Sequence, residues 1–162
     1  MPSVPAFPRA ADIEASLELM AERCEDPTPF VYERLFAQQP EMRAYFWRDT
    51  NDAIKGEMLA RTFAAILDFV GDRRYAGHMI GTEMITHEGY DIPREVFATF
   101  FAVVGETVEA LLADAWTPAF EIAWREMLEE IAGYAAAVPR NDIATPAFDK
   151  QKQEMQRRFA AG

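Results

Sequence analysis

The sequence predicts an all-α fold, and three of its features support that prediction. Apolar residues recur at steps of three and four along most of the chain, which is the spacing of one helix face. No segment alternates between apolar and polar residues in the manner of a half-buried strand. The 162 residues are 50% apolar, which is enough for one ordinary domain with its own core.

Two helices are predicted in the first part of the chain. The first is marked by three apolar residues about one turn apart, Ile13, Leu17 and Met20. The second begins at Thr28, a capping residue, has Pro29 in its first turn, and runs to Pro40. The polar, turn-prone run WRDTNDA at 47–53 then predicts a loop or a short irregular helix.

Four helices are predicted between this loop and residue 138, and each has an apolar face. These faces consist of Leu59, Phe63, Ile66 and Val70; Ile80, Met84 and His87; Phe97, Phe100, Phe101, Val104, Val108 and Leu111; and Phe120, Trp124, Met127, Leu128 and Ile131. After Val138 the sequence becomes polar. We therefore predict one domain over 1–138, with residues 139–162 as a linker and polar C-terminal tail.

Charge and cysteine content exclude several classes of protein. The chain has 16 basic and 27 acidic residues, a net charge of −11, whereas nucleic-acid binding needs a basic face. Its single cysteine, Cys24, cannot form an internal disulfide, and the N-terminus lacks the basic and apolar regions of a signal peptide. Charges interrupt every apolar stretch well before the roughly 18 residues of a membrane span. We expect a cytoplasmic protein that binds neither nucleic acid nor membrane.

Few residues are available for catalytic or metal chemistry. No Gly-x-Ser-x-Gly elbow occurs, and Cys24 lies far from both histidines in sequence, so nucleophilic catalysis has little support. A zinc or di-iron site is also poorly supported, because Glu83 precedes His87 by four residues rather than three. His78 is expected at the surface or at a hinge. His87 is either a core histidine bonded to a carbonyl or a metal ligand, and spacing alone does not decide between them.

Four segments, in this order, resemble the bacterial globins, including the globin domain of flavohaemoglobins. FVYERLFAQQPEMRAYF at 30–46 resembles their second helix and the corner that follows it. KGEMLARTFAAILDFV at 55–70 resembles the distal helix, and ITHEGYDIPREVF at 85–97 resembles the proximal helix and its corner. TPAFEIAWREMLEEIAGY at 117–134 resembles the last globin helix. The resemblance covers roughly residues 10–137.

The resemblance implies a globin fold, with helices packed three over three around one haem b, and a C-terminal extension. It implies that His87 is the proximal ligand of the iron, that Phe46 stacks on the porphyrin, and that the Tyr32 hydroxyl stabilises bound oxygen. The other residues that it implies around the haem are Lys55, Leu59, Phe63, Met84, Ile92, Phe97 and Phe101.

Two positions depart from the family pattern. Lys55 aligns with the distal histidine or glutamine, where a lysine could approach a haem propionate, bond to oxygen or, if deprotonated, bind iron. Phe97 replaces the proximal tyrosine of flavohaemoglobins, and the glutamate partner of that tyrosine aligns near Pro139. Because that pair makes the imidazole a stronger donor and favours oxygen activation, its absence argues against peroxidase-like chemistry.

The function implied is reversible binding of a diatomic gas, O2, CO or NO, for storage, transport or sensing, and enzymatic activity is not required for it. Two alternatives stay open. One is a haem-free signalling module of globin fold, supported by Lys55 and the unexplained tail. The other is a nitric oxide dioxygenase that takes electrons from a separate reductase. The oligomeric state is not indicated.

Overall fold

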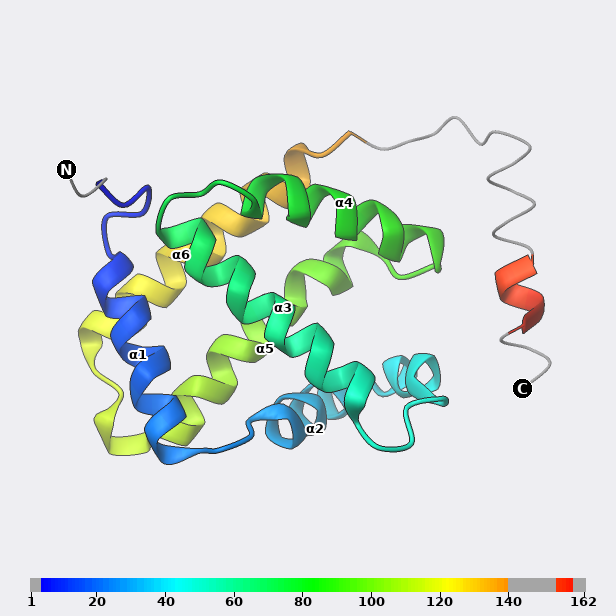
Figure 1. Cartoon of the computed structure of the whole chain (residues 1–162), viewed down its shortest axis with the longest axis horizontal. Helices are drawn as coiled ribbons and strands as arrows, with labels where there is room; N and C mark the ends of the chain where they lie inside the picture. Colours follow the sequence, from blue (N-terminus) through cyan, green and yellow to red (C-terminus); the bar gives the residue numbers. More distant parts are fainter. Residues whose placement is uncertain (1–3, 140–153, 159–162) are drawn as a thin grey trace.

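The prediction of an all-α chain is confirmed. In the computed structural model, which describes residues 4–139 and 154–158, helices are the only regular elements (Figure 1). The elements are α1 (Ala10–Arg23), α2 (Thr28–Gln38), the 3-10 helix η1 (Pro40–Phe46), α3 (Ala53–Val70), α4 (Ala76–Gly89), α5 (Arg94–Leu112), the 3-10 helix η2 (Ala113–Ala115) and α6 (Pro118–Ala137).

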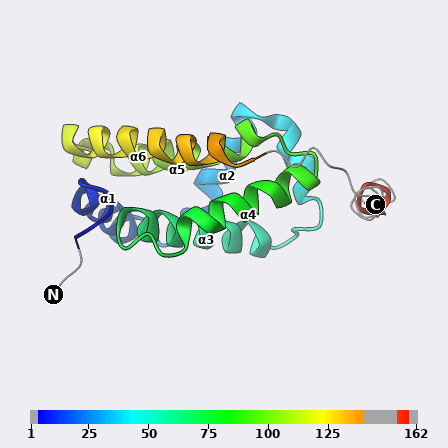
Figure 2. The ribbon, with the colours of Figure 1, turned by 90° about the horizontal axis from the view of Figure 1, so that it is seen from above.

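The helices pack in two layers, as the predicted three-over-three arrangement requires. Seen from above, α1, α3 and α4 lie in one layer and α5 and α6 in the other, with α2 beside α5 (Figure 2). Helix α5 packs against α1, α2, α4 and α6 and is the central element of the core. The segment Arg94–Ala115 is long and apolar enough to cross a membrane, but the core helix of a soluble protein passes the same test.

The crossing of α1, α5 and α6 is fixed by Trp124. Its indole Nε1 donates a hydrogen bond of 2.9 Å to the hydroxyl of Ser16, and both side chains are buried. A Cβ atom at Gly105 would lie 2.9 Å from Trp124 Cε3, so α5 can approach the indole this closely only with glycine at that position. A buried indole N–H needs such a partner, and the bond therefore sets how α1 lies on α6.

Two side chains hold α4 in place at its two ends. The carboxylate of Asp68 accepts hydrogen bonds from the backbone N–H groups of Tyr75 and Ala76, which caps the start of the helix. Burial alone would raise the pKa of Asp68, but these bonds outweigh it and hold the pKa below its usual value. At the other end, Arg94 pairs with Glu88 at 2.7 Å and donates to backbone carbonyls at the end of α6.

The predicted second helix is too long at its C-terminal end. The structure ends α2 at Gln38 and begins the 3-10 helix η1 at Pro40. The reason is local, because a residue before proline is disfavoured in the α conformation, and Gln39 has φ −137° and ψ 77°. The loop expected after Phe46 is present, and α3 begins at Ala53.

Candidate functional site

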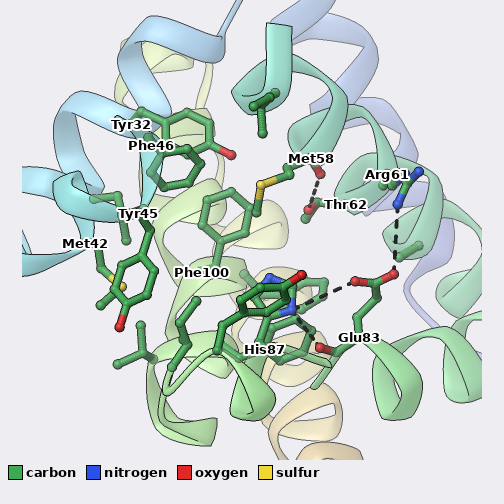
Figure 3. A pocket seen from close by; sticks show the side chains of 18 of the residues that line it. Tyr32, Met42, Tyr45, Phe46, Met58, Arg61, Thr62, Glu83, His87 and Phe100 are labelled. Carbon is green, nitrogen blue, oxygen red and sulfur yellow. Dashed lines mark hydrogen bonds and ion pairs between the residues drawn. The ribbon is translucent and has the colours of Figure 1, made fainter. Parts of the chain in front are cut away.

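A cavity of about 470 Å³ lies between α2, η1, α3, α4 and α5. This volume falls within the range of small-molecule and cofactor pockets, about 300–1,000 Å³. Its wall is largely apolar and aromatic, and a few polar side chains interrupt it (Figure 3). Six of the predicted site residues line it together, Tyr32, Phe46, His87, Ile92, Phe97 and Phe101.

His87 lies in the last turn of α4, and its ring orientation is fixed. Its Nδ1 atom lies 2.6 Å from the carbonyl oxygen of Glu83, one turn earlier in the helix, and its ring centroid lies 5.1 Å from that of Phe97. A carbonyl can only accept, so Nδ1 carries the proton and donates it. The neutral ring then keeps its lone pair on Nε2, which is the atom left to bind a ligand.

Tyr32 reaches the cavity from α2 and carries a hydroxyl group without a partner. The residue is 2% exposed, and its hydroxyl has no hydrogen-bond partner in the part of the chain that the structure describes. The ring is held edge-on to Phe46, with centroids 5.3 Å apart, and the hydroxyl is directed toward the cavity (Figure 3). Burial, with a smaller contribution from the charge of Asp49, raises the pKa of Tyr32, so the phenol stays protonated and able to donate.

On α3, the residues that line the cavity are one position before the predicted ones. Ile54, Met58 and Thr62 line it, together with Arg61 and Ala65. The predicted residues Lys55, Leu59 and Phe63 do not belong to the wall. Leu59 is buried in the hydrophobic core at 1% exposure, and Phe63 packs against that core.

The loop before α3 explains where Lys55 goes. The buried carboxylate of Asp49 accepts backbone N–H bonds from Ile54 and Lys55, each of 3.0 Å, and so caps the first turn. The Lys55 ammonium lies 3.4 Å from Asp49 and 3.0 Å from Asp52. Burial would lower the pKa of Lys55, but its bonds to these carboxylates outweigh burial and raise it. Lys55 is therefore a charged partner of the loop rather than part of the cavity wall.

Met84 is the fourth predicted residue outside the cavity wall. It lies on α4 and is fully buried at 0% exposure, within the packed interior. It shares a helix face with Ile80, which does line the cavity, and one turn of α4 separates the two. The prediction from helical spacing found the right helix and face for Met84, but spacing does not tell cavity from core.

Several residues of the cavity wall are not among those predicted from the sequence, and the polar ones have the most bearing on the chemistry of the site. Arg61 and Glu83 line the cavity from α3 and α4, and Thr62 lies beside Arg61. The Thr62 hydroxyl donates to the carbonyl of Met58, so its proton is already used. A helical projection that starts from Ile54 places Met58, Arg61 and Thr62 on one face, but the stripe from Leu59 to Val70 is more apolar and so predicts the wrong face of the helix for the cavity.

Comparison with known proteins gives one match. A sequence model of the globin family matches residues 29–135, about two thirds of the chain, and covers all the elements that line the cavity. No curated protein and no solved structure matches the chain significantly.

Proposed function

The chain belongs to the globin family, and on that basis we propose that it holds one haem b through His87 and reversibly binds a diatomic gas there. One observation carries the proposal. His87 lines a largely apolar cavity of about 470 Å³ and bonds through Nδ1 to its own helix, which leaves the lone pair of the ring on Nε2. A neutral imidazole in this state is the common protein ligand of haem iron.

The residues around the cavity fit such a group. The Tyr32 hydroxyl is buried and has no partner among the described residues, which is costly unless a bound molecule supplies one. Phe46 and Phe100 offer flat apolar surfaces next to it. No three His, Cys, Asp or Glu side chains gather within residues 4–139 and 154–158, so a metal ion at His87 would need ligands from a bound group. The single cysteine excludes attachment through two thioether bonds, which favours a haem held without covalent links.

Haem supplies an iron centre that binds diatomic gases, and the protein sets the conditions around it. His87 would supply the protein ligand of the iron through Nε2, and its hydrogen bond to the carbonyl of Glu83 fixes the plane of the ring. Tyr32 is the residue that would donate a hydrogen bond to a polar gas ligand. On the α3 side, Ile54 and Met58 carry no donor, the Thr62 hydroxyl already donates to the carbonyl of Met58, and Arg61 pairs with Glu57. Tyr32 is therefore the donor that we propose for the ligand.

The finer assignment is a bacterial-type globin that binds and releases oxygen rather than activating it. Phe97 supports this assignment, because its ring contacts that of His87 and carries no hydroxyl to polarise the imidazole. Nitric oxide dioxygenase activity with a separate reductase is the enzymatic alternative. A haem-free signalling module is the other alternative, and the free Nε2 of His87 argues against it.

The test is a titration of the purified chain with haem, followed by reduction and repeated exposure to oxygen and argon. We expect saturation at one haem per chain, and a visible spectrum that converts reversibly between two forms. Nitric oxide consumption in the presence of oxygen, a reductase and its electron donor then tests the dioxygenase alternative. An oxygenated globin converts one nitric oxide to nitrate per haem and stops at the ferric form, whereas a dioxygenase is reduced again and continues through many turnovers. A chain that takes up no haem would be a haem-free module.

A further inference from the structure

We propose that Glu83 is a positioning residue for His87, that its carboxylate makes the imidazole a stronger donor to iron, and that Arg61 opposes this effect from α3. The inference rests on the proposed function, because it presupposes haem at His87. It assigns a role to the two charged side chains of the cavity wall.

Glu83 offers the His87 ring two oxygen atoms. Its backbone carbonyl lies 2.6 Å from Nδ1 and accepts the ring proton, while its carboxylate Oε2 lies 3.9 Å from the same nitrogen. Both contacts are drawn in Figure 3. The carboxylate is too distant for a hydrogen bond, yet its negative charge lies close to the N–H group. Negative charge at Nδ1–H increases electron density on the ring and strengthens the bond that Nε2 makes to a metal.

Arg61 brings an opposing charge to the same carboxylate. Its guanidinium Nη1 lies 4.0 Å from Glu83 Oε1 and belongs to α3, across the cavity from α4. The same guanidinium pairs with Glu57 at 2.9 Å, one turn earlier in α3. Arg61 is thus shared between two carboxylates, and the closer pair leaves Glu83 only partly neutralised. The net negative charge of Glu83 that acts on the His87 ring therefore depends on the distance between the Arg61 guanidinium and the Glu83 carboxylate.

Stability alone does not account for this arrangement. The Arg61 side chain is 63% exposed and the Glu83 side chain 37% exposed, and exposed ion pairs contribute little to folding. Replacing either residue should therefore leave the fold intact. The effect expected is on the metal bond, which makes it separable from a structural role.

The experiment uses the haem-loaded full chain and three single variants, Glu83→Gln, Arg61→Gln and Glu106→Gln, with the double variant Glu83→Gln/Arg61→Gln. Two quantities are measured. One is the iron–histidine stretching frequency of the ferrous protein, by resonance Raman spectroscopy. The other is the ratio of ferrous to ferric protein at a fixed potential. Glu106→Gln is the control, because it removes an equal charge from an exposed position on α5 that bonds to Gln38 rather than to the cavity.

In Glu83→Gln we expect a lower stretching frequency and a ferrous-to-ferric ratio about two- to fivefold higher, since solvent screens a partly exposed charge. Arg61→Gln should move both quantities the opposite way. In the double variant, the loss of Arg61 should add nothing, because Arg61 acts through Glu83. Glu106→Gln should keep the wild-type frequency.

Haem bound at His87 with the same frequency in Glu83→Gln as in wild type would overturn this inference and leave the proposed function standing. An effect of Arg61→Gln that persists without Glu83 would also contradict it. A wild-type chain that takes up no haem would overturn the proposed function, and this inference with it.

Discussion

The hydroxyl of Tyr32 and the imidazole of His87 meet at one cavity, the first reaching it from α2 and the second from α4. The two groups are in complementary states. Within the described residues, Tyr32 is a buried donor without an acceptor, whereas His87 donates its ring N–H to the Glu83 carbonyl and retains an acceptor atom, Nε2. Between them, a bound group can meet both needs, and the predictions below follow from that relationship.

Tyr32→Phe should raise the oxygen dissociation rate about tenfold to a hundredfold. The change removes a hydrogen bond to partly charged oxygen, worth about 1.5 to 3 kcal/mol, and leaves the ring packing in place. Flash photolysis or rapid mixing of the oxygenated protein measures the rate. Tyr45→Phe is the matched control, because Tyr45 lines the same cavity but is not fully buried. An unchanged rate in Tyr32→Phe would mean that the hydroxyl does not meet the ligand.

Lys55→Ala should leave the spin state of the ferric protein unchanged across the neutral and alkaline range. The ammonium is held by Asp49 and Asp52, which raise its pKa, so releasing a neutral amine to iron is costly. A pH titration of the ferric absorption spectrum provides the measurement. Conversion to a low-spin form with a midpoint below about pH 8, lost in Lys55→Ala, would show that the lysine enters the cavity.

Acid should destabilise the wild-type protein more steeply than Asp49→Asn. Burial favours a higher pKa for Asp49, but the backbone bonds from Lys55 and Ile54 and the Lys55 ammonium hold it below its usual 3.8. A lowered folded-state pKa contributes stability above the unfolded value, and that stability is lost as the pH falls through the folded value. Thermal unfolding between about pH 6 and pH 3 tests this, with Asp52→Asn as the control. Equal slopes in wild type and Asp49→Asn would refute the capping role.

Much of the fold could be predicted from sequence because each core helix carries its own signal. The steps from Ile13 to Met20 and from Phe120 to Ile131 are strongly periodic, and both helices are present. The face of α3 that lines the cavity was harder to predict. This helix lies between the core and the cavity, so Ile54, Met58 and Ala65 form one apolar face and Leu59, Ile66 and Val70 another. Periodicity identifies such a helix but cannot say which face is which.

The polar part of the site depends on long-range contacts that no sequence pattern contains. Arg61 and Glu83 are 22 positions apart (83 − 61), and only the packing of α3 on α4 brings them together. Lys55 was expected at the haem because it aligns with a distal residue. The loop conformation that keeps Lys55 out of the cavity depends on Asp49, and composition does not reveal the capping bonds that Asp49 accepts from Ile54 and Lys55. His87, Tyr32 and Phe46 were found through short motifs that survive small errors of register.

Truncation after Val138 should leave haem binding intact, because α6 ends at Ala137 and the cavity wall lies within residues 32–101. Val138 is kept because its carbonyl accepts from Arg94. The predicted linker and tail at 139–162 fall largely outside the described residues; at 154–158, Gln156 contacts Asp91. Haem affinity of the truncated chain, measured by transfer to a competing apoprotein, is the test. Release of haem on truncation would place the domain boundary further along the chain.

The most direct test of the central claim compares haem titrations of His87→Ala and His78→Ala with that of the wild-type chain. His78 is the only other histidine, lies on the same helix and is exposed, so its loss controls for removing an imidazole from α4. We expect wild type and His78→Ala to develop a Soret band that saturates at one haem per chain and shifts with carbon monoxide after reduction. His87→Ala should lose stoichiometric binding while its helical circular dichroism stays close to wild type. A wild-type chain without a Soret band, or a His87→Ala variant that binds haem as the wild type does, would contradict the account.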